Sequence, residues 1–274
     1  MSVRGLTAVF VVALATAAPV GARPTADHAS LPDAVGDGDP DITNVTAASN
    51  GSGGLTFIVD IANRTDLAET EFVQIFIDSD HNQATGTQPN GVEYALQMDR
   101  QDVMLFRWDG AKFAPVANSS AYGYIFKGFR LGVRLSDLGS PTGSISYWAE
   151  TVSGQNGDDA PNGQIADLPL STTPLQLSVT EFAASAKTVK AGKRFGAGMR
   201  VQRSDLEETA SAGEVGCSAK VGAKPVKVQA NFPEDFALCF GTAPKWAKGK
   251  TLKITLTFEL DGVKVSRTAS LKVR

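Results

Sequence analysis

Gly54-Leu-Thr-Phe-Ile-Val-Asp-Ile61 sets the pattern of the chain, because apolar Leu55, Phe57, Val59 and Ile61 occupy every second position. A period of two places these side chains on one face of a β-strand. The same alternation recurs, with turn residues between the runs, in residues 73–77, 94–98, 103–108, 129–135 and 145–149. Runs at this spacing, without a sustained helical period, predict an all-β fold with an antiparallel, jelly-roll-like sandwich.

The C-terminal hundred residues repeat this alternation in shorter runs. About seven such runs in a segment of this length predict an immunoglobulin-like β-sandwich. Asp261-Gly262 lies between two of the runs. Both residue types tolerate the positive φ of a tight turn, so this dipeptide predicts a hairpin.

The two halves differ in charge. The chain of 274 residues has 26 Lys and Arg and 29 Asp and Glu, a formal net charge of −3. Residues 30–173 hold 19 acidic and 7 basic side chains, whereas residues 174–274 hold 9 acidic and 17 basic ones. So abrupt a change indicates a domain boundary, and the Pro-containing segment 168–174 is suited to a linker. We therefore predict one sandwich over residues 33–170 and a second over residues 175–274.

The N-terminus predicts export. Arg4 precedes an apolar run over residues 6–18, and Val20-Gly21-Ala22 offers small side chains for cleavage after Ala22. This arrangement is typical of a signal peptide, here residues 1–22. A membrane anchor is the weaker alternative, because a spanning helix needs about 20 apolar residues. We expect a secreted, extracellular protein that is free of the membrane after cleavage.

Cys217 and Cys239 are the only cysteines. In an exported chain, an even pair predicts a disulfide. Closing a loop of this size stabilises the fold by about 3 kcal/mol in the chain-entropy model. With only two His residues as well, a zinc site built from several His and Cys ligands is excluded.

An acidic loop is the strongest candidate for a functional site. Asp78, Asp80 and Asn82 place oxygen ligands at alternate positions after a predicted strand, and Glu93 follows before the next strand. Carboxylate and amide oxygens are the ligands that Ca²⁺ prefers. The loop is not an EF-hand, because Pro89 stands where that motif has its bidentate Glu. We predict a structural Ca²⁺ site, with a solvated acidic turn as the alternative.

A second, weaker cation site is suggested by two further acidic segments. One segment precedes the first strand and the other lies in the predicted loop 154–163. First and last strands of a sandwich often pair, so the two segments are candidates to meet, and charge that only aids solubility is the alternative. The residues are Asp33, Asp37, Asp39, Asp41, Asp158 and Asp159.

The sequence offers little support for a catalytic function. The mature chain has His28 in its N-terminal tail and His81 in the acidic loop, and it lacks the Gly-x-Ser-x-Gly elbow of α/β-hydrolases. A glycosidase would need two carboxylates at a defined separation, for which Glu93 and Glu150 are candidates. We therefore expect a protein that is not an enzyme.

Several motifs together resemble a known group of exported bacterial β-sandwich proteins. These motifs are Gly38-Asp-Pro-Asp-Ile42, the strand 54–59, the loop 77–86, Gly91-Val-Glu-Tyr94 and Arg107-Trp-Asp-Gly110. They are similar to family 9 carbohydrate-binding modules and DOMON domains. The resemblance implies a structural Ca²⁺ and the binding of a sugar or haem. The scarcity of His disfavours haem, whereas Trp108 and Trp148 are candidates to stack on a sugar. Their strands alternate with apolar residues, which favours burial of both in the core instead.

These observations favour an exported, non-catalytic binding protein for a glycan or cell-wall polymer. The basic second domain could bind an anionic cell-wall polymer or contact the acidic first domain. The alternative is a structural or adhesive extracellular protein without a small ligand. We expect no nucleic-acid partner, because the basic residues lack a recognised motif and interleaved aromatics. The sequence leaves the oligomeric state open.

Overall fold

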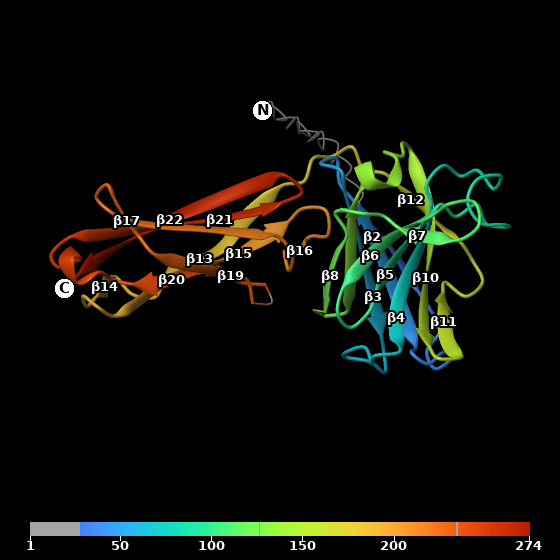
Figure 1. Cartoon of the computed structure of the whole chain (residues 1–274), viewed down its shortest axis with the longest axis horizontal. Coiled ribbons are helices and arrows are strands. Elements are labelled where there is room, and N and C mark those ends of the chain that lie inside the picture. Colours follow the sequence, from blue (N-terminus) through green and yellow to red (C-terminus); the bar gives the residue numbers. More distant parts are fainter. Residues whose placement is uncertain (1–27, 126, 234) are drawn as a thin grey trace, which may run out of the picture.

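The computed structural model describes residues 28–125, 127–233 and 235–274, so the predicted signal peptide lies outside the described residues. The fold is all-β, and its strands form two sandwiches that lie next to each other along the longest axis of the molecule (Figure 1). Within the described ranges, no helix has the length and apolar character needed to cross a membrane.

The first sandwich consists of two antiparallel sheets that pack face to face. The five-stranded sheet has the order β1-β2-β3-β9-β8, with β1 His28–Pro32, β2 Ile42–Ser49, β3 Gly54–Ile61, β9 Phe129–Arg134 and β8 Tyr122–Ile125. The seven-stranded sheet has the order β11-β10-β4-β5-β6-β7, and β12 also pairs with β10. Its strands are β11 Asn156–Ala160, β10 Ser144–Ser153, β4 Glu71–Asp78, β5 Tyr94–Met98, β6 Val103–Trp108, β7 Phe113–Pro115 and β12 Ala166–Pro169.

The alternating residues of the sequence form the core of this sandwich. Leu55, Phe57 and Val59 of β3 are fully buried, and they belong to the same apolar cluster as Ile75 and Tyr147 of the facing sheet. Phe57 and Tyr147 bring their ring centroids to 5.3 Å across the gap between the sheets. A short 3₁₀ helix, η1 (Leu135–Leu138), follows β9 and buries Leu138.

The second sandwich has its own apolar core. One sheet has the order β13-β15-β20-β19, with β16 paired to β15; the other has the order β14-β22-β21-β17-β18, in which β14 runs parallel to β22. The strands are β13 Leu177–Ala184, β14 Thr188–Val189, β15 Arg194–Arg203, β16 Glu208–Thr209, β17 Glu214–Val221, β18 Lys224–Val226, β19 Val228–Asn231, β20 Ala237–Thr242, β21 Thr251–Leu260 and β22 Val263–Val273. The 3₁₀ helix η2 (Lys245–Ala247) precedes β21.

Two local predictions hold in this domain. Leu260 pairs with Val263, and Asp261 and Gly262 adopt φ angles of 50° and 79°, as a two-residue hairpin requires. Cys217 of β17 and Cys239 of β20 form a disulfide, which joins the two sheets across the core. Residues 224–231 are divided between β18 and β19, which belong to different sheets.

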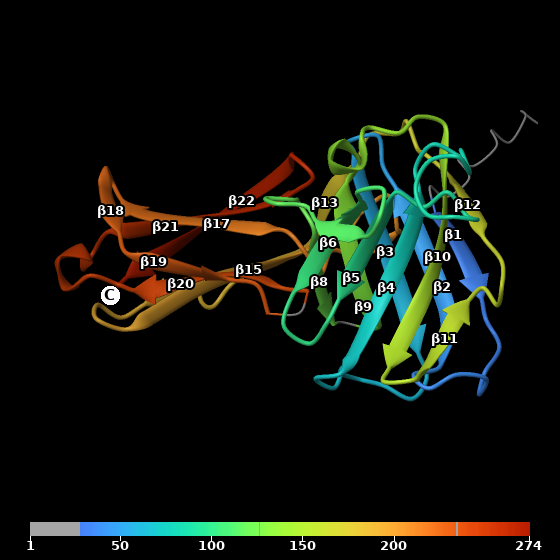
Figure 2. The ribbon, with the colours of Figure 1, turned by 45° about the vertical axis from the view of Figure 1, so that its right-hand side comes forward.

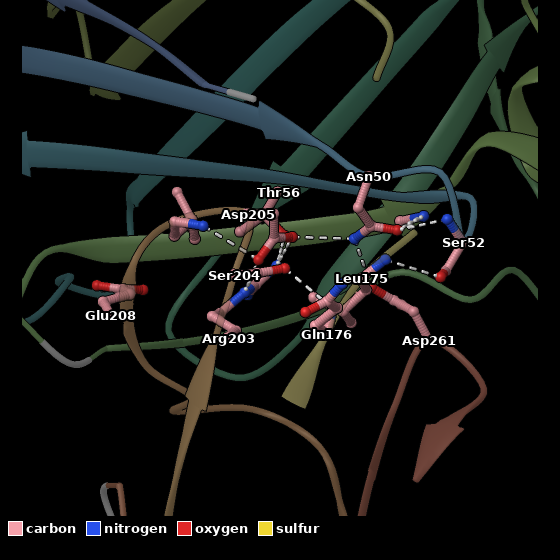
Figure 3. A network of polar contacts seen from close by, with 12 residues as sticks. Asn50, Ser52, Thr56, Leu175, Gln176, Arg203, Ser204, Asp205, Glu208 and Asp261 are labelled. Atoms are coloured by element: carbon pink, nitrogen blue, oxygen red, sulfur yellow. Dashed lines mark hydrogen bonds and ion pairs between the residues drawn. The ribbon is translucent and has the colours of Figure 1, made fainter. Parts of the chain in front are cut away.

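A buried polar network joins the two sandwiches (Figure 3). Arg203, at the end of β15, donates from Nε and Nη2 to the two carboxylate oxygens of Asp205, both at 2.7 Å. Asp205 also accepts a hydrogen bond of 2.9 Å from Asn50 of the first domain, and Arg203 reaches Thr56 Oγ1 at 3.2 Å. Arg203 and Asp205 are only 1% and 2% exposed. A buried ion pair of the second domain is therefore bonded to two neutral side chains of the first, Asn50 and Thr56.

Further contacts extend the junction over the outer face of the five-stranded sheet. Arg130 of β9 is buried and forms a two-pronged ion pair with Glu208 of β16. Tyr124 Oη lies 2.8 Å from Ser211 Oγ, and the amide of Leu175 donates to Ser52 Oγ at 3.1 Å. The junction thus pairs an arginine of the acidic first domain with an acid of the basic second domain. None of these contacts joins a lysine of the second domain to an acid of the first.

Burial and ion pairing shift the pKa values of Arg203 and Asp205 in opposite directions. Burial alone raises the pKa of Asp205, but the hydrogen bonds and charge of Arg203 outweigh it, and the pKa lies below its usual value. Burial likewise opposes the charge of Arg203, yet Asp205 raises the pKa of Arg203 overall. Because the pKa of Asp205 is lower in the folded state, its contribution to stability is present at neutral pH. It is lost as the pH falls below about 4, the pKa of an unpaired Asp.

We predict that Asp205→Ala lowers the free energy of unfolding by about 3–5 kcal/mol, because it leaves the guanidinium of Arg203 buried and unpaired. Chemical denaturation at pH 7 measures this change. Asp235→Ala, which removes a partner of the half-exposed Arg200, serves as the control and should cost less than about 1 kcal/mol. Equal losses in the two variants would contradict a special role of the buried pair.

Candidate functional site

The acidic loop connects β4 to β5 at one end of the seven-stranded sheet. Asp78 is the last residue of β4 and is only 6% exposed, whereas Asp80 is exposed. Glu93 directly precedes β5, which pairs with β4. The hairpin register therefore returns Glu93 to the point where Asp78 leaves the sheet.

Carboxylate oxygens of Asp78, Asp80 and Glu93 lie within 4.8 Å of one another. The loop holds them by local hydrogen bonds: Asp78 Oδ1 accepts from the amide of His81 at 2.7 Å, and Glu93 Oε2 accepts from the amide of Ser79 at 2.9 Å. Thr85 Oγ1 bridges Asp80 and Glu93, with a contact of 2.6 Å to Glu93 Oε1. Asn82, the fourth predicted ligand, instead directs Oδ1 to the amide of Ala84 at 3.0 Å.

The donor set suits a hard divalent cation. Three carboxylates converge, and oxygen is the ligand atom that Ca²⁺ and Mg²⁺ prefer. Only hydroxyl and amide groups are shown to bond these carboxylates within the described ranges, so their mutual repulsion is not offset by a basic side chain. The residues present fit a bound Ca²⁺ with Asp78, Asp80 and Glu93 as its protein ligands.

The imidazole of His81 reaches β10, which lies beside β4. Its Nε2 lies 2.9 Å from Ser144 Oγ, and its Nδ1 lies 2.9 Å from Ser146 Oγ, which donates to Asp167 at 2.6 Å. Ser144, His81 and Asp167 resemble the nucleophile, base and acid of a catalytic triad. However, Ser146 lies between the imidazole and the carboxylate, which are 3.9 Å apart. Asp167 is 71% exposed, so it lacks the burial that orients a catalytic acid. These contacts fix the loop against β10.

The second acidic group is brought together in part. Asp33, Asp37 and Asp158 have carboxylate oxygens within 4.8 Å of one another. Asp158 is 8% exposed and accepts from the amide of Ile42 at 2.7 Å, and burial together with the neighbouring acids raises its pKa. Asn162 Nδ2 donates to both Asp33 and Asp37.

The other predicted members of this group have different roles. Asp39 pairs with Arg64 at 2.8 Å, and Asp41 accepts from the amide of Gly36 at 2.9 Å. Asp159 is exposed on β11, opposite Glu150 of β10. The structure therefore separates Asp39, Asp41 and Asp159 from the carboxylates that converge.

The outer face of the seven-stranded sheet carries a half-buried aromatic band, formed by Trp148, Phe76, Phe106, Trp108 and Phe113. The rings of Phe76 and Trp148 stack with centroids 4.9 Å apart, and Phe76 lies 6.1 Å from Phe113. Trp108 meets Phe113 edge-on at 5.4 Å. Both tryptophans are therefore outside the core, and the expectation that they are buried in it is wrong. Along their strands, they occupy the alternate positions whose side chains point away from the core.

A row of polar side chains runs beside this band on the same face. Glu150, Gln74 and Gln97 are direct neighbours across β10, β4 and β5, two residues along the strands from Trp148, Phe76 and Ala95. Trp148 Nε1 donates to Glu150 Oε1 at 3.2 Å, and burial raises the pKa of Glu150. We call Glu150, Gln74 and Gln97 the polar row. Sequence reasoning missed both glutamines, because isolated Gln residues in a strand carry no motif.

The carboxylates proposed for a glycosidase are too far apart. Glu150 aligns across the strands with Gln97 of β5, four residues beyond Glu93. That offset alone is about 13 Å along the strand direction, at roughly 3.3 Å per residue. Retaining and inverting enzymes place their carboxyl groups about 5–9.5 Å apart. Glu93 and Glu150 therefore do not form such a pair.

No protein-family model and no curated protein matches this sequence. Among solved structures, the chain is similar to a chimeric titin Z1Z2-Z1Z2 tandem, with 13% identity, a TM-score of 0.27, and 81% of this chain and 90% of that chain covered. It is also similar to Rst D1-D2, with 9% identity, a TM-score of 0.26, and 81% and 91% of the two chains covered. Scores this low carry no conclusion about function.

Proposed function

We propose that the protein is an exported, non-catalytic binding protein for a neutral glycan, which it holds on the outer face of the first sandwich. The observation that carries the proposal is the aromatic band beside the polar row. Sugar rings present apolar faces edged by hydroxyl groups. The faces pack on aromatic rings, while amides and carboxylates form hydrogen bonds with the hydroxyl groups. A merely solvated sheet face has no need of five aromatic side chains.

The position of this face supports the proposal. The second domain covers part of the outer face of the other sheet, through Thr56, Tyr124 and Arg130. The aromatic band lies on the opposite side of the sandwich, where β10, β4 and β5 face the viewer in Figure 2. Ring contacts within the band fix the tryptophans before a ligand arrives, which lowers the entropy lost on binding.

We also propose that the acidic loop binds a structural Ca²⁺, with Asp78, Asp80 and Glu93 as ligands. The loop lies at the end of the outer face. The amide of Trp108, a member of the aromatic band, donates a hydrogen bond of 2.7 Å to the backbone carbonyl of Glu93. A cation would hold this end of the sheet rigid. The weaker group of Asp33, Asp37 and Asp158 is a candidate for a second ion.

A structural or adhesive role without a small ligand is the second candidate. It is favoured by the junction, where the ion pair of Arg130 with Glu208 and the hydrogen bonds of Asn50 and Thr56 to the buried Arg203–Asp205 pair hold the two sandwiches together as a spacer would require. The two proposals differ in what they predict for polysaccharides.

For glycan binding, we predict that the mature protein is retained on at least one of cellulose, chitin, xylan and β-1,3-glucan. Trp148→Ala should weaken that binding about tenfold or more, as loss of an aromatic contact at the centre of a site does. Gln74→Ala should weaken it less. Ile165→Ala removes an exposed apolar side chain outside the aromatic band and serves as the control. Lack of retention on all four polymers would favour the structural role and contradict glycan binding.

For the cation, we predict that millimolar Ca²⁺ raises the melting temperature and that EDTA reverses the rise. At a hundredfold excess over the dissociation constant, binding to the folded state adds about 2.7 kcal/mol. Asp80→Asn should abolish the calcium-dependent rise, because Asp80 is exposed and its loss leaves the sheet intact. Glu69→Gln, an exposed acid outside the loop, is the control. A melting temperature that is the same with Ca²⁺ and with EDTA would exclude the site.

A further inference from the structure

Positive charge gathers at the end of the second sandwich that points away from the first. Strand pairing brings residues 187–194, 220–227, 243–253 and 272–274 to this end, where the C-terminus lies in Figure 1. These segments contain 13 Lys and Arg residues and no Asp or Glu. We call them the cationic tip. All nine acidic residues of 174–274 lie outside it.

Among the residues that the structure describes, no ion pair joins a base of the cationic tip to an acid. In the described part of the second domain, the basic partners of the ion pairs are Arg200, Arg203 and Lys264, and all three lie outside the tip. Like charges this dense repel one another and attract polyanions. A surface that served only solubility would mix both signs.

An exposed tryptophan stands in the middle of this charge. Trp246 belongs to η2 and is 46% exposed. Lys224 Nζ and Lys250 Nζ lie 5.5 Å and 5.6 Å from the ring centroid, within the range of cation–π attraction. The exposed ring of Trp246 therefore has two ammonium groups beside it.

Two hollows meet at Trp246. One, of about 500 Å³, is lined by Trp246 together with Lys227, Gln229 and Thr242. The other, of about 690 Å³, is lined by Trp246 together with Lys220, Lys224 and Lys253. Both hollows are thus lined by the indole of Trp246 and by at least one lysine.

We propose that this surface binds an acidic polysaccharide. The carboxylates or sulfates of such a chain would pair with the lysines, which act as point charges, while a sugar ring packs on Trp246. A chain polymer fits two hollows in succession better than a compact anion does. The site is separate from the aromatic band of the first domain, and it takes a different class of glycan.

The experiment uses the full mature protein and three immobilised polymers: polygalacturonate, dextran sulfate and neutral dextran. We expect binding to at least one of the two acidic polymers and none to dextran. The affinity should fall about tenfold or more between 0.1 M and 1 M salt, because the screening length shortens from about 10 Å to 3 Å. The double variant Lys224→Ala/Lys250→Ala should weaken binding at least tenfold, and Trp246→Ala should weaken it about fivefold without a change in net charge.

The matched control is Lys264→Ala/Arg267→Ala, which removes the same charge from the same sheet outside the tip and should change the affinity less than twofold. Trp148→Ala should also leave binding to acidic polymers intact, which separates this site from the neutral-glycan site. A Trp246→Ala variant with unchanged affinity would overturn the proposal. So would tighter binding to single-stranded polynucleotide or to anionic lipid vesicles than to either acidic polysaccharide.

Discussion

The arrangement of the whole molecule depends on one buried ion pair. Arg203 and Asp205 are removed from water at the place where two sandwiches with separate cores meet. Removing two charges from water is costly, and the cost is recovered only where the geometry of the pair and its hydrogen bonds is favourable. Asn50 and Thr56 of the first domain complete that geometry. The pair therefore specifies the relative orientation of the two domains as well as their contact.

This constraint divides the surface of the first sandwich. The five-stranded sheet places Thr56, Tyr124 and Arg130 toward the second domain, and Gly132 of β9 leaves room for the ring of Tyr122 there. The seven-stranded sheet keeps its outer face free, with the aromatic band and the polar row on it. At the far end of the second domain, the cationic tip is equally free. The two proposed binding surfaces thus lie on parts of the molecule that the junction does not use.

Much of the fold follows from the sequence, because period-two alternation is local. Leu55, Phe57 and Val59 identify their own inner face, and Asp261-Gly262 identifies its own turn. In the acidic loop, alternate spacing suggested Asp78 and Asp80, and Glu93 was suggested by its place before the next strand; the hairpin register brings the three together. Asn82 followed the same spacing, but its side chain bonds to the loop backbone.

Other features depend on pairings between distant segments. Trp148 and Phe76 lie next to each other only because β10 pairs with β4 in one register, and no local signal sets that register. The charge difference between the halves suggested that opposite charges attract the domains. In the structure, the bases of the second domain gather at the far end, and Glu208 of that domain meets Arg130 of the first. A net charge per domain does not say where on the domain the charge lies.

We expect the buried junction to make one rigid body of the two sandwiches, because its geometry is set by the Arg203–Asp205 pair. This expectation is tested most directly by the distance distribution between spin labels at Gln101→Cys and Ser270→Cys, both exposed and one in each domain, with the native disulfide intact. A rigid junction predicts a single narrow distribution of distances, which broadens in Asp205→Ala. A broad distribution in the otherwise unchanged protein would contradict it.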